Sequence, residues 1–142
     1  MSSAPHHHSE GNGLLFHQIL TACKQTLFDN KKLSSMESLA SSNSNTFSIT
    51  INELCAILDS FTFEINKLKA IYILKSYNQF AVMTCSGVSE MLKKSFTFDN
   101  SRCQALQYLY QLIHDRGLNY GQVLKAFDFH SNQEQARKLL LS

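Results

Sequence analysis

The sequence predicts an all-α protein of four stacked helical hairpins, about eight helices, that together form a compact right-handed superhelix. Three observations predict this class. The stretch SFTFEINKLKAIYIL, which begins at Ser60, returns as SFTFDNSRCQALQYL from Ser95. Apolar residues recur at helical spacing within both copies. Finally, one Pro and five Gly in 142 residues argue against a β-rich chain with many tight turns.

A phenylalanine marks the same place in four copies of this pattern. We call these residues the anchor phenylalanines: Phe28, Phe63, Phe98 and Phe129. They lie 31 to 35 residues apart, a period typical of stacked helical hairpins. We expect each anchor to lie in the turn between two helices and to fill the gap there, where burial of one Phe stabilises by about 1.5–3 kcal/mol. The alternative is an aromatic stripe that binds a partner.

The helix after each anchor has a constant face. A small residue stands seven positions after the anchor and a leucine eleven after it, and both offsets fall on one side of a helix. These residues are Ser35, Ala70, Ala105 and Ala136, and Leu39, Leu74, Leu109 and Leu140. Together with the apolar segment before each anchor, they predict helices near 14–27, 32–41, 50–60, 66–78, 86–95, 101–115, 119–126 and 131–141. We therefore expect a flexible tail over 1–13 and a single domain over 14–142, with units 14–41, 48–78, 84–115 and 118–142.

The part of the chain after about residue 45 resembles a known family. The residues that carry the resemblance are Phe96, Phe98, Asp99, Arg102, Asp115, Asn119, Tyr120, Phe127 and Phe129. They match the helical family catalogued as domain of unknown function 4476, over roughly residues 45–142. His130 and Gln133 depart from its pattern, since they replace an acid and a base. The family occurs in bacteria and animals, mostly as an appended helical domain, so the resemblance implies a fold and no activity.

An acid follows each of the first three anchors, and a base stands three residues after the acid. The bases are Lys32, Lys67 and Arg102. One interpretation is an exposed acid at a helix N-terminus with its i,i+3 partner, which is worth a few tenths of a kcal/mol. The other is a ladder of these three bases that binds an anionic partner, and it makes them the candidate binding residues.

Few residues in the sequence indicate a catalytic, metal or phosphate-binding site. The chain has no CxxC pair, its His17, His114 and His130 are isolated, and no glycine-rich phosphate loop is present. Cys85 lies in a segment expected to be exposed and reactive, and with His114 it could form a nucleophile and base. Nothing in the sequence brings these two together. We therefore predict no catalytic residue, no metal site and no cofactor.

The other three cysteines, Cys23, Cys55 and Cys103, lie in apolar-periodic stretches, which predicts buried thiols in a reducing compartment.

A net charge of +2 without a basic tract gives no indication of nucleic acid or membrane binding. We expect an intracellular protein, cytoplasmic or nuclear. The predicted function is a non-catalytic helical protein-interaction or structural module of a larger protein, with a protein partner and no prediction of oligomeric state. The alternative is a small ligand-binding or enzymatic domain with a pocket between repeats.

Overall fold

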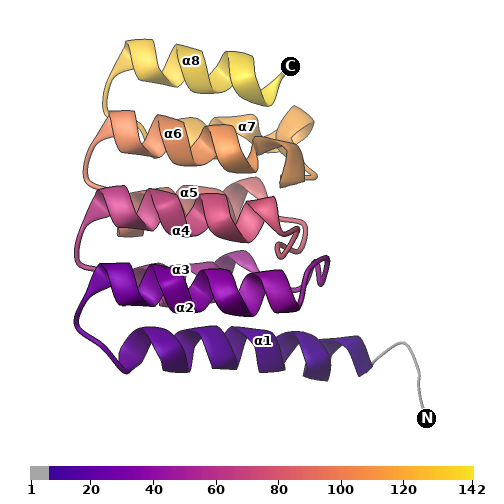
Figure 1. Ribbon diagram of the computed structural model, residues 1–142. Helices are drawn as coiled ribbons and strands as arrows, with labels where there is room; N and C mark the ends of the chain where they lie inside the picture. The colour runs from indigo at the N-terminus through magenta and orange to yellow at the C-terminus, as the bar shows by residue number, and fades with distance from the viewer. Residues whose placement is uncertain (1–6) are drawn as a thin grey trace. The chain divides into compact units, whose positions relative to one another are not determined.

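The computed structural model describes the backbone of residues 7–142 and the side chains of residues 13–142. This part of the chain contains eight α-helices, one short 3-10 helix and no strand, so the predicted all-α class is confirmed (Figure 1). Two compact units divide the chain, with the boundary between Ala81 and Val82. Each unit contains four α-helices, and the expected single domain over 14–142 stays a prediction.

Unit 1 contains α1 (His7–Lys24), α2 (Asp29–Ser42), α3 (Ile51–Asp59) and α4 (Glu64–Ser76). Helix α1 packs against α2 and α3, and α2 packs against α4. The α1–α2 and α3–α4 turns lie at one edge of the unit (Figure 1). Residues 7–13 of the expected flexible tail are helical, and residues 1–6 lie outside the described part of the chain.

Unit 2 contains α5 (Cys85–Ser95), α6 (Asp99–Leu109), the 3-10 helix η1 (Tyr110–Leu112), α7 (Arg116–Leu124) and α8 (His130–Leu140). Helix α5 packs against α7, α6 against α8, and α7 against α8. As in unit 1, the turns that lead into its even-numbered helices share one edge (Figure 1).

The starts of the helices follow two different rules. Helices α3 and α5 begin after Thr50 and Thr84, whose hydroxyls accept the N–H groups of Glu53 (3.2 Å) and Gly87 (3.1 Å). Each even-numbered helix begins directly after an anchor phenylalanine, which occupies the N-cap position with an extended backbone. The predicted starts of these helices are therefore one to three residues too late.

The leucine column forms part of the core. Leu74, Leu109 and Leu140 are buried, as are the alanines of the small-residue column. The first copy departs from this register, because Leu39 is only half-buried. Helix α2 instead buries Met36 and Ala40.

The link between α2 and α3 is fixed by a buried polar side chain. Gln79 is fully buried, and its amide donates to the carbonyl oxygens of Ala40 (2.9 Å) and Asn43 (2.8 Å) at the end of α2. Its side-chain oxygen accepts the hydroxyl of Thr46. These bonds satisfy helix-end carbonyls that would otherwise lack a partner.

Among the described residues, no helix combines the length and the apolar character that a bilayer span requires.

Candidate interaction surface

The acid after an anchor holds the neighbouring turn of the same unit. In unit 1 the buried Asp29 carboxylate accepts the backbone N–H groups of Thr62 (3.1 Å) and Phe63 (3.1 Å) and the side-chain amide of Asn66 (2.9 Å). Burial raises the pKa of Asp29, but the bonds from Asn66, Thr62 and Phe63 outweigh it, so that the pKa lies below its ordinary value. The carboxylate thus stays charged and fixes the α3–α4 turn against the α1–α2 turn.

Unit 2 repeats this arrangement. The buried Asp99 carboxylate accepts the backbone N–H groups of Asp128 (2.9 Å) and Phe129 (2.9 Å). The α7–α8 turn is therefore held against the α5–α6 turn by the residue that follows Phe98. In both units two anchor phenylalanines are placed on adjacent, mutually bonded turns.

In two of the three pairs the base satisfies helix ends. Arg102 is buried, and its guanidinium donates to the carbonyl oxygens of Leu92 (3.1 Å), Phe96 (2.7 Å) and Ala126 (2.5 Å). These carbonyls lie at the ends of α5 and α7, where backbone acceptors have no partner within the helix. Arg102 also lies 4.0 Å from Asp99.

Lys32 has the corresponding role in unit 1. Its ammonium group donates to the carbonyl oxygen of Ser60, lies 3.9 Å from Asp29, and lies 5.6 Å from the ring centre of Phe61. In the last copy Gln133 replaces the base and still donates to the carbonyls of Leu124 (3.3 Å) and Phe127 (3.1 Å).

The expectation of exposed acid–base pairs is therefore wrong for Asp29–Lys32 and Asp99–Arg102, whose side chains are buried. Lys67 is half-buried. Burial at helix ends favours the structural interpretation of this column over a ladder that binds an anionic partner. The ladder would require charged groups that a partner can reach.

The anchor phenylalanines are exposed, which corrects the expectation that they fill a gap in the core. Their exposed fractions are 66% for Phe28, 62% for Phe63, 69% for Phe98 and 66% for Phe129. The aromatic residue two positions earlier is the buried one, at 5% for Phe61, 2% for Phe96 and 3% for Phe127. In three of the four turns the buried aromatic is thus the other phenylalanine, and in the first turn that position is Thr26.

The expectation of an exposed, reactive Cys85 is also wrong. Cys85 is fully buried, and its backbone N–H donates to the Asp115 carboxylate (2.8 Å), which also accepts the amide of Asn119 (2.8 Å). Burial, followed by the hydrogen bond to Asp115 and its charge, raises the pKa of the Cys85 thiol to about 12. His114 is exposed, and no hydrogen bond joins it to Cys85 in the described part of the chain. The two do not form a nucleophile–base pair.

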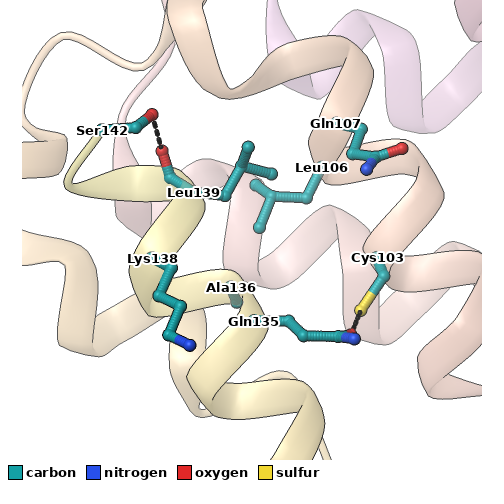
Figure 2. A pocket seen from close by; sticks show the side chains of 8 residues that line it. All are labelled: Cys103, Leu106, Gln107, Gln135, Ala136, Lys138, Leu139 and Ser142. Carbon is teal, nitrogen blue, oxygen red and sulfur yellow. Dashed lines mark hydrogen bonds between the residues drawn. The ribbon is translucent and has the colours of Figure 1, made fainter.

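A groove of about 450 Å³ lies between α6 and α8. Figure 2 shows Leu106 and Leu139 facing each other, with Gln107 and Ser142 near one end and Cys103 and Gln135 near the other. The Cys103 thiol donates to the side-chain oxygen of Gln135 (3.6 Å). Burial raises the pKa of this thiol, so it is not activated as a nucleophile. No cluster of three potential metal ligands occurs among the described side chains.

Comparison with protein families gives one result. The family described as Domain of unknown function (DUF4476) matches residues 12–78 and again residues 73–140. The two matches run through α1–α4 and α5–α8, and the resemblance thus extends further than residues 45–142. Neither a curated protein nor a solved structure matches the chain significantly.

Proposed function

Because this chain belongs to the DUF4476 family, whose description names no activity, we propose a function from the surface of the chain itself. The protein is a non-catalytic helical-repeat module that binds a protein partner through its anchor phenylalanines. The observation that carries this proposal is the presence of an exposed phenylalanine at the N-cap of every even-numbered helix.

Phenylalanine is a poor residue for this position. An N-cap side chain such as Ser, Thr, Asp or Asn accepts a free N–H of the first turn, and its loss costs about 0.5–2 kcal/mol. Thr50 and Thr84 do this for α3 and α5, whereas none of the four anchors makes a side-chain cap bond. Helix stability therefore does not explain why the chain carries phenylalanine at all four sites. A role of these phenylalanines in binding a partner explains their presence.

The anchors are also held in a way that suits binding. Asp29 fixes the backbone N–H of Phe63, and Asp99 fixes that of Phe129. An aromatic side chain on an ordered backbone loses little entropy on binding, and such residues often dominate the energy of protein interfaces. The partner that fits is a protein surface with apolar pockets, each of which takes one phenylalanine ring.

The groove between α6 and α8 favours a second candidate, a domain that binds a small ligand. Its lining contains no carboxylate and no histidine, and its Cys103 thiol has a raised pKa. Lys138 is the one amine of the lining, and no second general acid or base accompanies it there. The groove therefore supports binding rather than an enzymatic function.

Site-specific photo-crosslinking tests the proposal. Benzoylphenylalanine placed at Phe63 or at Phe98 should crosslink to the same protein in the native cell extract. The matched control is benzoylphenylalanine at Leu118, which is 87% exposed but lies in α7, away from the turns. A crosslinked protein common to the two anchors and absent from the control supports the proposal. Equal products at all three positions would contradict it.

A further inference from the structure

Three exposed lysines lie at the ends of two helices of unit 2. Lys93 and Lys94 belong to the last turn of α5, and Lys125 occupies the C-cap position of α7. All three residues are exposed. Among the described residues, none of the three takes part in an ion pair. A partner can therefore reach these cations, in contrast to the buried bases of the acid–base pairs.

One buried side chain brings the two helix ends together. The guanidinium of Arg102 donates to the carbonyl oxygens of Leu92 and Phe96, which precede and follow the two lysines of α5. It also donates to the carbonyl oxygen of Ala126, the residue after Lys125. Helices α5 and α7 pack against each other as well. The three lysines thus lie together, at the edge of unit 2 that carries the turns into α6 and α8 (Figure 1).

Two anchor phenylalanines belong to the same edge. Phe98 and Phe129 occupy the N-cap positions of α6 and α8, and they are 69% and 66% exposed. The Asp99 carboxylate holds the backbone N–H of Phe129. We call the three lysines and these two phenylalanines the basic edge of unit 2. It combines two aromatic rings with three cations.

The acids near the basic edge offset only part of this charge. Asp128 is 68% exposed and lies 3.9 Å from Arg102. Glu90 is exposed and stands four residues before Lys94 on α5, so it lies on the same face of that helix. The buried Asp99 and Arg102 compensate each other. The three lysines therefore leave a surplus of positive charge.

Unit 1 has no such surplus at the corresponding place. With the anchors of the two units aligned, the counterparts of the three lysines are Cys23, Lys24 and Asp59. Cys23 is buried, and α3 ends at Asp59 without a basic residue in its last turn. A cation is favourable at the C-terminus of any helix, yet α3 forms with an acid there. Helix-end electrostatics therefore does not explain why unit 2 gathers three lysines.

We propose that the basic edge of unit 2 binds an acidic segment of the partner protein. Carboxylates of that segment pair with Lys93, Lys94 and Lys125, while its apolar side chains contact Phe98 and Phe129. The inference rests on the proposed function in that the anchors bind a protein, and it adds the charge of that protein.

Nucleic acid and membranes fit this edge less well. Binding to an anionic membrane usually takes a cluster of about four to eight bases. Single-stranded nucleic acid is bound in a positively charged groove that follows its backbone. The basic edge has three lysines, and the exposed carboxylate of Asp128 stands in the α7–α8 turn among them.

Two synthetic peptides that differ only in charge test the inference, namely Glu-Leu-Glu-Glu-Leu-Glu and Gln-Leu-Gln-Gln-Leu-Gln with blocked ends. The glutamate peptide should shift the backbone NMR signals of Lys94 and Phe98 in the wild-type chain saturably. The glutamine peptide should bind about tenfold more weakly at low salt, because three exposed ion pairs contribute about a factor of two each. Added salt should reduce this difference, since it screens exposed charges.

Replacement of the three lysines together by glutamine should remove the difference between the two peptides. The matched control changes three lysines of α4 and α8 outside the basic edge: Lys69→Gln, Lys75→Gln and Lys138→Gln. Urea melts first show that both variants are folded. The control should keep the wild-type preference for the glutamate peptide. Equal binding of the two peptides to the wild-type chain would overturn the proposal, and so would the absence of a saturable shift.

Competing anions test the class of partner. Oligothymidylate of the same charge as the glutamate peptide, and phosphatidylserine vesicles, should each bind the wild-type chain more weakly than this peptide does. Tighter binding of either one, lost on replacement of the three lysines, would assign the basic edge to nucleic acid or to a membrane. That result would overturn the proposal.

A last variant separates this inference from the proposed function. Phe98→Ala/Phe129→Ala should weaken the binding of both peptides and keep the preference for glutamate. Crosslinking of one protein from Phe63 and Phe98, together with equal binding of the two peptides, would overturn the acidic partner alone. A preference for glutamate with unchanged affinities in the double variant, and no crosslink, would overturn the role of the anchors alone.

Discussion

The Asp99 carboxylate accepts the backbone N–H of Phe129 at 2.9 Å, across 30 residues of sequence. This bond joins the acid that follows one anchor phenylalanine to the backbone of the next anchor in unit 2. Asp29 and Phe63 form the same bond in unit 1, at 3.1 Å. Placement of the anchors thus depends on two buried carboxylates.

Asp99→Asn should destabilise unit 2 by about 2–4 kcal/mol, because it leaves buried N–H donors poorly paired and removes the charge beside Arg102. Urea unfolding measures the change. Asp128→Asn is the control: it also removes a carboxylate 3.9 Å from Arg102, but this side chain is 68% exposed, and such a pair contributes at most about 1 kcal/mol. Equal effects of the two substitutions would show that the bonds to Asp128 and Phe129 contribute nothing specific.

The pH dependence of stability should depend on Asp29, whose pKa is lowered in the folded chain. A carboxylate with a lowered pKa stabilises the fold at pH values above its unfolded-state pKa of about 3.9. This contribution is lost as the pH falls through the lower pKa of the folded state. The difference in unfolding free energy between wild type and Asp29→Asn should therefore shrink from about pH 7 to about pH 2. Urea melts at both pH values measure it, and a constant difference would contradict the assignment.

The two phenylalanines of one turn should differ sharply in their effect on stability. Phe96→Ala should cost about 3–5 kcal/mol, because it leaves a cavity in the core. Phe98→Ala should cost at most about 1 kcal/mol, because that ring is mostly in solvent. Urea melts of the two variants provide the comparison. A large loss of unfolding free energy for Phe98→Ala would show that this anchor stabilises the fold.

Alkylation should distinguish the four cysteines. Cys55 and Cys103 are half-buried, while Cys23 and Cys85 are buried, and the pKa of Cys85 is raised to about 12. A brief iodoacetamide pulse followed by mass spectrometry should therefore label Cys55 and Cys103 first. Cys85 should react only when the chain unfolds. Early labelling of Cys85 would contradict its burial beside Asp115.

The helices were predictable because their signals are local. The spacing of Leu74, Leu109 and Leu140 marks one face of a helix, and the structure buries that face. The partners of the acids were not predictable, because Asp29 binds a turn more than 30 residues away. A pattern of Asp and Lys at i,i+3 looks the same whether the pair is exposed or buried.

The site was predicted only in part, for similar reasons. Either phenylalanine of an F-x-F stretch could have been the buried one, and the direction of the turn decides this. Cys85 looked exposed because it lies in a segment expected to be a loop, whereas its backbone N–H is bonded to Asp115 of a distant segment. The groove between α6 and α8 depends on the packing of two helices and has no sequence signature of its own.

Competition in the crosslinking experiment tests the central claim most directly, namely that the anchor phenylalanines bind a partner rather than stabilise the fold. Benzoylphenylalanine at Phe63 supplies the crosslink, and an excess of unlabelled wild-type chain should suppress it. An equal excess of unlabelled Phe28→Ala/Phe63→Ala/Phe98→Ala/Phe129→Ala chain, first shown to be folded, should not suppress it. Suppression by that variant as complete as by wild type would contradict the account.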